Sequence, residues 1–86
     1  MNIAGDMNYY GDLLKVDGSL IYYSYGCSTK NMTGILMIDT KDQSWTNMRF
    51  PDGIEKESRM FRSFANKVLG QCSRGEIHKK VSREIG

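Results

Sequence analysis

The stretch LLKVDGSLIYYSYG, residues 13–26, decides the fold of this chain. Two runs of apolar and aromatic residues flank Asp17 and Gly18. An Asp-Gly pair is among the strongest local signals for a β-hairpin, because both central residues of a type I′ turn have a positive φ. The sequence therefore predicts one strand over residues 9–16 and a second over residues 19–25, joined by a tight turn.

That turn sets a register in which Val16 faces Ser19 and Leu14 faces Ile21, and side chains then alternate between the two faces of the hairpin. The two predicted faces are Leu14, Ile21, Tyr23 and Tyr25 on one side, and Leu13, Leu20 and Tyr22 on the other. Both faces are apolar, whereas a sheet with one solvated face alternates cleanly between apolar and polar residues. We therefore expect each face to be covered at least in part.

Residues 33–39, TGILMID, and residues 44–50, SWTNMRF, predict a third and a fourth strand, since β-branched and aromatic side chains favour the extended backbone. The polar turn between them predicts two cross-strand pairs, Ile38 with Trp45 and Met37 with Thr46. Short hairpin loops join all four segments, which is the pattern of an antiparallel meander.

A long amphipathic helix is predicted over residues 55–72, because apolar residues recur there with the helical period. The predicted stripe is Phe61, Phe64, Ala65, Val68 and Cys72, with Met60 and Leu69 at its edges. Ser73 and Glu76 then match a capping box. The repeat of Ile77, Val81 and Ile85 after it predicts a short second helix over residues 75–85.

The predicted fold class is therefore α+β: a small antiparallel meander of about four strands, one long amphipathic helix and a short C-terminal helix. The length of 86 residues favours a single domain over residues 1–86, with residues 1–8 as a loose N-terminus. A composition with 40% hydrophobic and 26% charged residues is typical of a soluble globular protein and argues against a disordered chain.

The sequence also carries expectations about the cellular setting. No apolar run is long enough to cross a bilayer, so we expect no membrane association. The first residues lack the basic start and apolar centre of a secretory signal, so we expect a cytoplasmic protein. Cys27 and Cys72 should then be reduced thiols.

No residue pattern predicts catalysis, a cofactor or a metal. His78 with Cys27 and Cys72 lacks the spacing of metal ligands. Asp12 and Asp39 have no group converging on them that would make them an acid–base pair. We therefore predict that the protein is not an enzyme.

Two groups of residues are candidates for binding. Aromatic side chains are enriched at interface hot spots, and they can also stack on bases, although tyrosine is an ordinary strand residue as well. The candidate interface residues are Tyr22, Tyr23, Tyr25 and Trp45, of which Trp45 is equally a core candidate opposite Ile38. Basic side chains can contact phosphate, or can simply form a solvated face. The candidate anion-binding residues are Arg59, Arg62, Lys67, Arg74, Lys79 and Lys80.

These groups lead to two functional hypotheses. The first is a non-enzymatic protein-binding module, such as an adaptor, inhibitor or immunity-type protein, that forms a homodimer and binds a further, unknown protein. The second is a module that binds nucleic acid or a nucleotide through its basic C-terminal third and the tyrosines of the sheet. The homodimer is expected because one helix can cover only one of two apolar faces, and an exposed apolar patch is a liability for a monomer.

Overall fold

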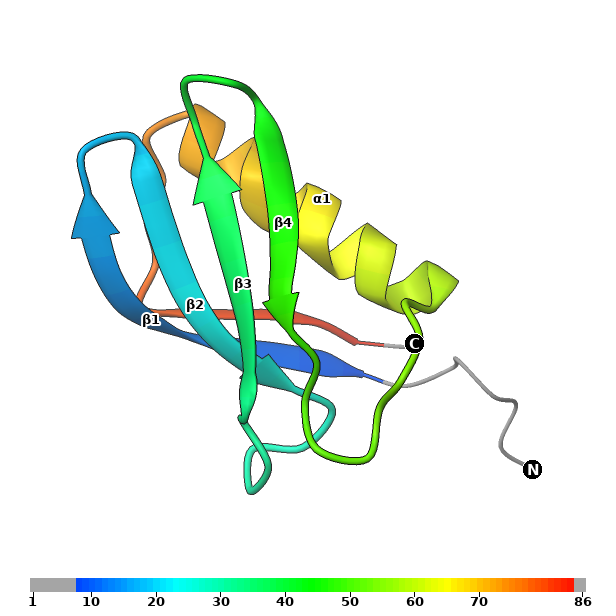
Figure 1. The fold of residues 1–86 in the computed structure, drawn as a ribbon. Helices are drawn as coiled ribbons and strands as arrows, with labels where there is room; N and C mark the ends of the chain where they lie inside the picture. Colours follow the sequence, from blue (N-terminus) through cyan, green and yellow to red (C-terminus); the bar gives the residue numbers. More distant parts are fainter. Residues whose placement is uncertain (1–7, 85–86) are drawn as a thin grey trace.

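The computed structural model describes residues 8–84, which form a five-stranded antiparallel sheet with one helix across one of its faces (Figure 1). The elements are β1 (Tyr9–Asp17), β2 (Leu20–Gly26), β3 (Gly34–Asp39), β4 (Ser44–Arg49), α1 (Arg59–Ser73) and β5 (Lys80–Arg83). The predicted α+β class and the antiparallel meander are confirmed. Of the expected loose N-terminus, residues 1–8, only Asn8 lies among the described residues.

The strand order is β4-β3-β2-β1-β5, so the first four strands form the meander and the last strand returns to the free side of β1. In the pairing of β5 with β1, Tyr9 lies opposite Arg83 and Asp12 lies opposite Lys80. The predicted pairs of Ile38 with Trp45 and Met37 with Thr46 are also confirmed.

The predicted second helix over residues 75–85 is wrong. Its described part contains strand β5, and Ser73 to Glu76 end α1 instead of opening a new helix. Gly75 has a φ of 81°, and the amides of Gly75 and Glu76 donate to the carbonyls of Cys72 and Gln71 at 3.0 and 2.9 Å. Such a left-handed glycine is a common helix C-terminus. Val81 between the less buried Lys80 and Ser82 fits a strand as well as it fits a helix.

The predicted register of the first hairpin is also wrong. Asp17 pairs with Leu20, so Gly18 and Ser19 are the central turn residues, and Gly18 supplies a φ of 62° at the first central position, as in a type II′ turn. A bulge between Leu13 and Lys15 shifts the register again. Leu13, not Leu14, therefore shares a face with Tyr23.

Helix α1 begins at Arg59, four residues later than expected, because Ser58 caps it: the Ser58 hydroxyl accepts a hydrogen bond from the Phe61 amide at 3.0 Å. The predicted apolar stripe is confirmed, since Phe61, Phe64, Ala65, Val68 and Cys72 are all buried, with Met60 and Leu69 partly buried beside them. Glu55 and Glu57, expected in the first helical turn, precede the helix.

An aromatic cluster forms the centre of the core between α1 and the sheet. The ring of Phe64 stacks on that of Tyr9 with 5.8 Å between the ring centroids, and the ring centroids of Phe61 and Tyr25 lie 5.0 Å apart. The glycine at position 11 lets Phe64 lie close to β1, because a Cβ there would lie 3.2 Å from the Phe64 ring and 2.8 Å from Val81. The helix thus packs tightly on one face of the sheet, and no described helix covers the other face.

Candidate interface on the open face of the sheet

The face of the sheet opposite α1 carries no helix or strand within residues 8–84. Figure 1 shows the helix on the far side of the sheet, with β1 to β4 turned toward the viewer. The strand residues that point toward α1 are buried, and the alternation along each strand therefore directs the residues between them to the other side. We call this side the open face.

Cross-strand pairing arranges the side chains of the open face in rows, three of which reach from β1 to β4. A fourth, shorter row consists of Ser82, Tyr10 and Gly26 at the far end of β1. The acidic row, beside the β1–β2 turn, consists of Asp17, Leu20, Asp39 and Ser44. The middle row consists of Lys15, Tyr22, Met37 and Thr46. The basic row consists of Lys80, Asp12, Ser24, Ile35 and Arg49.

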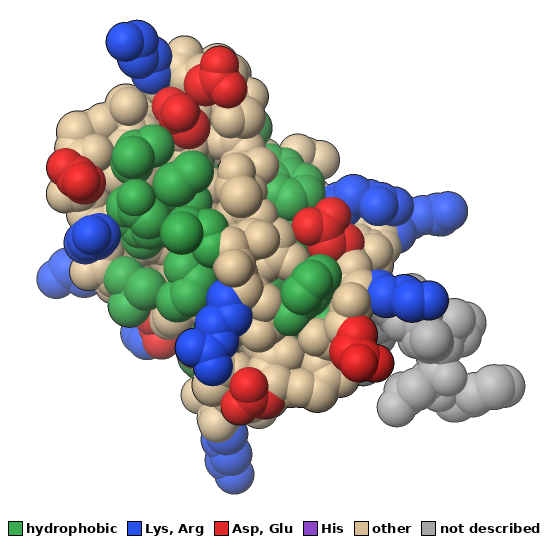
Figure 2. Space-filling view, viewed as in Figure 1, with side chains coloured by type: hydrophobic (Ala, Val, Ile, Leu, Met, Phe, Trp, Pro, Cys, Tyr) green, Lys and Arg blue, Asp and Glu red, His purple; other side chains and the backbone are tan. Residues whose placement is uncertain are grey.

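An apolar strip crosses these rows at β2 and β3. It consists of Leu20, Tyr22, Ile35 and Met37, all of them half-buried. Figure 2, in the same view as Figure 1, shows hydrophobic side chains gathered over β1, β2 and β3 and surrounded by charges of both signs. Leu14 and Met48, each at a bulge, add further apolar surface and are 54% and 55% exposed.

The charges of the open face are unevenly placed. In the acidic row, neither Asp17 nor Asp39 forms an ion pair with a described residue. In the basic row, Lys80 and Asp12 neutralise each other at 3.0 Å, which leaves the charge of Arg49. Lys15 lies over the Tyr22 ring, with its ammonium 4.8 Å from the ring centroid. The open face is therefore acidic at one end, apolar in the middle and basic at the other end.

Of the four candidate interface residues, only Tyr22 lies on the open face. Tyr23 and Tyr25 point under α1, are 0% and 1% exposed, and donate their hydroxyl protons to the His78 carbonyl and to Asn47 Oδ1, both at 2.7 Å. Burial raises the pKa of both phenols above the usual range. Trp45 is half-buried, with its ring edge-on to Phe61 and its Nε1 donating to Asn66 at 2.8 Å.

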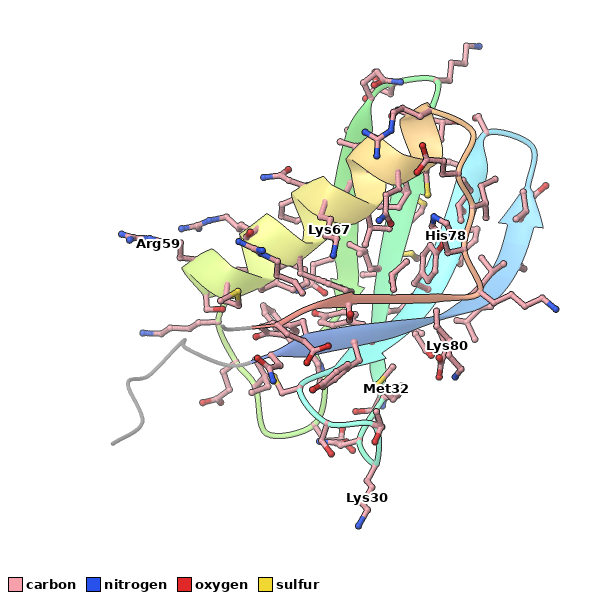
Figure 3. All side chains as sticks on the ribbon, turned by 180° about the vertical axis from the view of Figure 1, so that it is seen from behind. Lys30, Met32, Arg59, Lys67, His78 and Lys80 are labelled. Carbon is pink, nitrogen blue, oxygen red and sulfur yellow. The ribbon has the colours of Figure 1, made fainter. Side chains whose placement is uncertain are left out.

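The six candidate anion-binding residues do not share one surface. Lys80 lies on the open face, whereas Arg59 and Lys67 project from α1 on the other side (Figure 3). Arg74 forms an ion pair with Glu76 at 3.1 Å, which lowers the pKa of that carboxyl. Lys79 is exposed in the loop before β5.

A basic flank nevertheless remains beside β5, and it includes Arg83, which was not among the predicted residues. Lys67 donates to the Ser82 carbonyl at 2.7 Å, and Arg83 donates to the Ser63 hydroxyl at 3.0 Å. Arg59, one helical turn before Ser63, forms no ion pair within residues 8–84. Arg62 lies instead toward β4, one turn before Asn66, which accepts a hydrogen bond from Trp45. We call Arg59, Lys67 and Arg83 the basic flank.

A cleft of about 290 Å³ adjoins the basic row, and no local sequence pattern predicts it. Its walls come from β1, β5 and the loop between β2 and β3: Tyr10, Gly11, Asp12, Thr29, Met32, Lys80, Val81, Ser82 and Glu84. The loop folds back tightly, since a Cβ at Gly26 would lie 1.9 Å from the Asn31 carbonyl oxygen. Only a glycine fits there, and its small size lets Met32 reach the cleft opposite Lys80 (Figure 3).

The two cysteine thiols of the described chain lie in or beside the core. Burial raises the pKa of the Cys72 thiol and of the half-buried Cys27 thiol, so both are poor nucleophiles at neutral pH. Among residues 8–84, no three His, Cys, Asp or Glu side chains gather closely enough to hold a metal ion. Nor is the helix of this region long and apolar enough to span a membrane.

Comparison of the chain with protein-family models, with curated proteins and with solved structures gave no match. The function is therefore inferred from the geometry of the open face and of the basic flank.

Proposed function

We propose that this chain is a small, non-enzymatic, cytoplasmic protein-binding module that self-associates and binds its partner through the open face. The observation that carries the proposal is the apolar strip of Leu20, Tyr22, Ile35 and Met37, which no described element covers. A role as an adaptor, an inhibitor or an immunity-type protein fits a small domain that offers an apolar surface to a partner.

The composition of the open face supports protein binding. Tyr22 and Met37 lie at its centre, and both residue types are enriched at protein interfaces. Charged and polar residues surround them, which is the usual arrangement of an apolar centre with a polar rim. Apolar surface rimmed by polar residues is typical of protein interaction sites.

Sedimentation equilibrium tests the proposal. We expect the wild-type protein to associate reversibly at micromolar concentration, and Tyr22→Glu to shift it to a 9.8 kDa species, because the new carboxylate would be desolvated at the centre of the contact. Ile77→Glu is the matched control, since Ile77 is exposed but lies in the loop between α1 and β5. A wild-type protein that stays at 9.8 kDa up to high micromolar concentration would contradict self-association.

The basic flank supports a second candidate function, the binding of nucleic acid through its phosphates. Lys67 and Arg83 are hydrogen-bonded to neutral oxygens, so their charges stay available to an anion. We expect a duplex oligonucleotide to bind about 40-fold more weakly at 200 mM than at 50 mM salt if all three cations contact phosphate. Replacing Arg59, Lys67 and Arg83 together by alanine should abolish this binding, and unchanged binding would exclude the flank.

A further inference from the structure

The two edge strands of the sheet, β4 and β5, differ in how their outward backbone groups are satisfied. The Lys79 carbonyl faces β1 and accepts from the Leu13 amide at 2.8 Å, so the alternation along the strand turns the Ser82 carbonyl outward. Lys67 of α1 donates to that outward carbonyl at 2.7 Å. Within the described residues, the backbone of β4 is hydrogen-bonded only to β3. The edge at β5 is therefore partly closed, and the edge at β4 is open.

The outward groups of β4 follow from the pattern of the ladder. The Thr40 amide, directly after β3, donates to the Ser19 carbonyl on the side of β2 at 2.9 Å. Because backbone groups alternate in direction along a strand, every second residue before Thr40 bonds β4 instead, and Thr46 is the partner in one of these pairs. Trp45 and Asn47, on either side of Thr46, therefore direct their amides and carbonyls away from the sheet. An extended polypeptide has the donors and acceptors that match such an edge.

The N-terminal half of α1 lies beside this edge. Figure 1 shows the start of the helix projecting past β4. Trp45 of β4 donates to Asn66 at 2.8 Å, and its ring is edge-on to Phe61. Arg62, one helical turn before Asn66, is exposed on this side of the helix. A strand added to β4 would therefore lie over the start of α1, with every second side chain directed toward the helix.

Cations without an ionic partner lie on both sides of the β4 edge. Arg62 lies on the helix side, and the exposed Arg49 lies at the end of β4 on the open face. Neither forms an ion pair within residues 8–84, and β4 itself contains no acidic residue. Glu57, whose charge adds to burial in raising the pKa of Tyr25, precedes the helix and forms no ion pair with either arginine. Carboxylates on an added strand would therefore meet an unpaired cation on either face.

A second copy of this chain fits the β4 edge poorly. In a two-fold pairing of two β4 strands, both helices lie on the same face of the joined sheet, and their projecting starts meet. The two Arg62 side chains would then approach each other, and β4 offers no carboxylate to either. The charges therefore favour a different chain, one that carries acidic residues.

We propose that the outer edge of β4 binds an extended acidic segment of another protein, which adds a strand to the sheet. Backbone hydrogen bonds to Trp45 and Asn47 supply the affinity, and side chains supply the specificity. Because successive side chains of a strand point to opposite faces, two neighbouring acidic residues place one carboxylate toward Arg62 and the other toward Arg49. This binding site is separate from the open face and does not depend on self-association.

Fluorescence anisotropy with labelled peptides tests the charge preference. The probe is a peptide of about seven residues, valine and threonine in alternation around two central glutamates, and its matched control has two lysines instead. We expect the glutamate peptide to bind at least about tenfold more tightly than the lysine peptide, and Arg62→Glu to reverse this order. Lys79→Glu, an exposed change beside the opposite edge strand, is the control variant and should leave both Kd values unchanged.

Methylation of the peptide backbone tests the strand pairing itself. Alternate amides of an added strand point toward β4, and the amides between them point away from it. N-methylation of one alternate set in the glutamate peptide should abolish binding, whereas N-methylation of the other set should leave the Kd nearly unchanged. Equal effects of the two sets would show that the peptide does not pair as a strand and would overturn the inference.

The remaining outcomes separate this inference from the proposed function. Tyr22→Glu alters the open face, two strands away from β4, and should leave the Kd of the glutamate peptide unchanged even where it dissociates the self-associated protein. The inference is overturned if the glutamate peptide does not bind at millimolar concentration, or if Arg62→Glu binds it as tightly as the wild type. It is also overturned if saturating peptide dissociates the wild-type protein in sedimentation equilibrium, because the edge would then be occupied by a second copy. Unfolding curves like that of the wild type exclude misfolding as the cause of any loss.

Discussion

Phe64 is one of two phenylalanines that α1 buries in the core, and it stabilises the packing of the helix on the sheet. It is 0% exposed and contacts the rings of Tyr9, Tyr25 and Phe61. Phe64→Ala should lower the free energy of unfolding in urea by about 3–5 kcal/mol, since both the transfer energy and a cavity are involved. Arg62→Ala, an exposed position on the same helix, should change it by less than about 0.5 kcal/mol. A loss below about 1 kcal/mol for Phe64→Ala would contradict its place in the core.

The buried tyrosines make the protein sensitive to alkaline pH. Burial raises the pKa of Tyr9 to about 12 and raises those of Tyr23 and Tyr25 as well. The unfolded chain ionises these phenols near pH 10, so the folded state holds more protons above that pH. The contribution of the three phenols to the free energy of unfolding should therefore be constant below about pH 9 and fall as the pH rises from about 10 to 12.

Urea unfolding between pH 8 and pH 12 measures that slope. Tyr23→Phe removes one of the buried phenols and should make the decline with pH shallower, although it also loses the hydrogen bond to the His78 carbonyl. A slope that is the same in Tyr23→Phe and in the wild-type protein would contradict the assignment.

The buried residues of α1 could be predicted from the sequence, but the sequence did not indicate which tyrosines of β2 are buried. The apolar residues from Phe61 to Cys72 recur with the period of a helix and lie on one side of it, so their burial could be predicted from the sequence. Tyr22, Tyr23 and Tyr25 are the same type of residue and differ only in the face of β2 to which each side chain points. Which side the helix covers depends on packing between distant segments, and no local pattern contains that information.

At the level of secondary structure elements, the start of α1 depends on Ser58. Its hydroxyl accepts from the Phe61 amide, and its removal leaves that amide without its cap. Ser58→Ala should lower the free energy of unfolding by about 1 kcal/mol. Ser58→Asp should keep most of the stability, because aspartate is an equally good N-cap. Equal stability of Ser58→Ala and the wild type in urea would place the helix start elsewhere.

The strands of the meander were predictable to within one or two residues, and so was the pairing of β3 with β4. The register of β1 against β2 was not. The Asp17-Gly18 signal located the turn correctly, but Gly18 serves as the first central residue, and the bulge near Leu14 has no signature in the sequence. Strand β5 escaped prediction because its four residues gain their stability from β1, a partner about seventy positions earlier in the chain. The open face could be anticipated as uncovered apolar surface, but its rows and its cleft depend on the register.

For the whole molecule, the proposed dimer couples stability to concentration. A dimer that dissociates on unfolding is stabilised by mass action. We expect the midpoint of thermal unfolding to rise by about 3–6 °C for each tenfold increase in protein concentration. Tyr22→Glu should remove this dependence, and a wild-type midpoint that is independent of concentration would contradict the dimer.

The pairing of β1 with β5 has a consequence for biosynthesis. A ribosome makes β1 first among the strands and β5 last, so one edge of β1 stays without its neighbour until almost all of the described chain has been made. During that time the nascent hairpin exposes an unpaired strand edge, which invites pairing with other chains. We expect the meander of β1 to β4 to form before β5 has been made. Pairing of β5, the four residues Lys80–Arg83, then covers the exposed edge of β1.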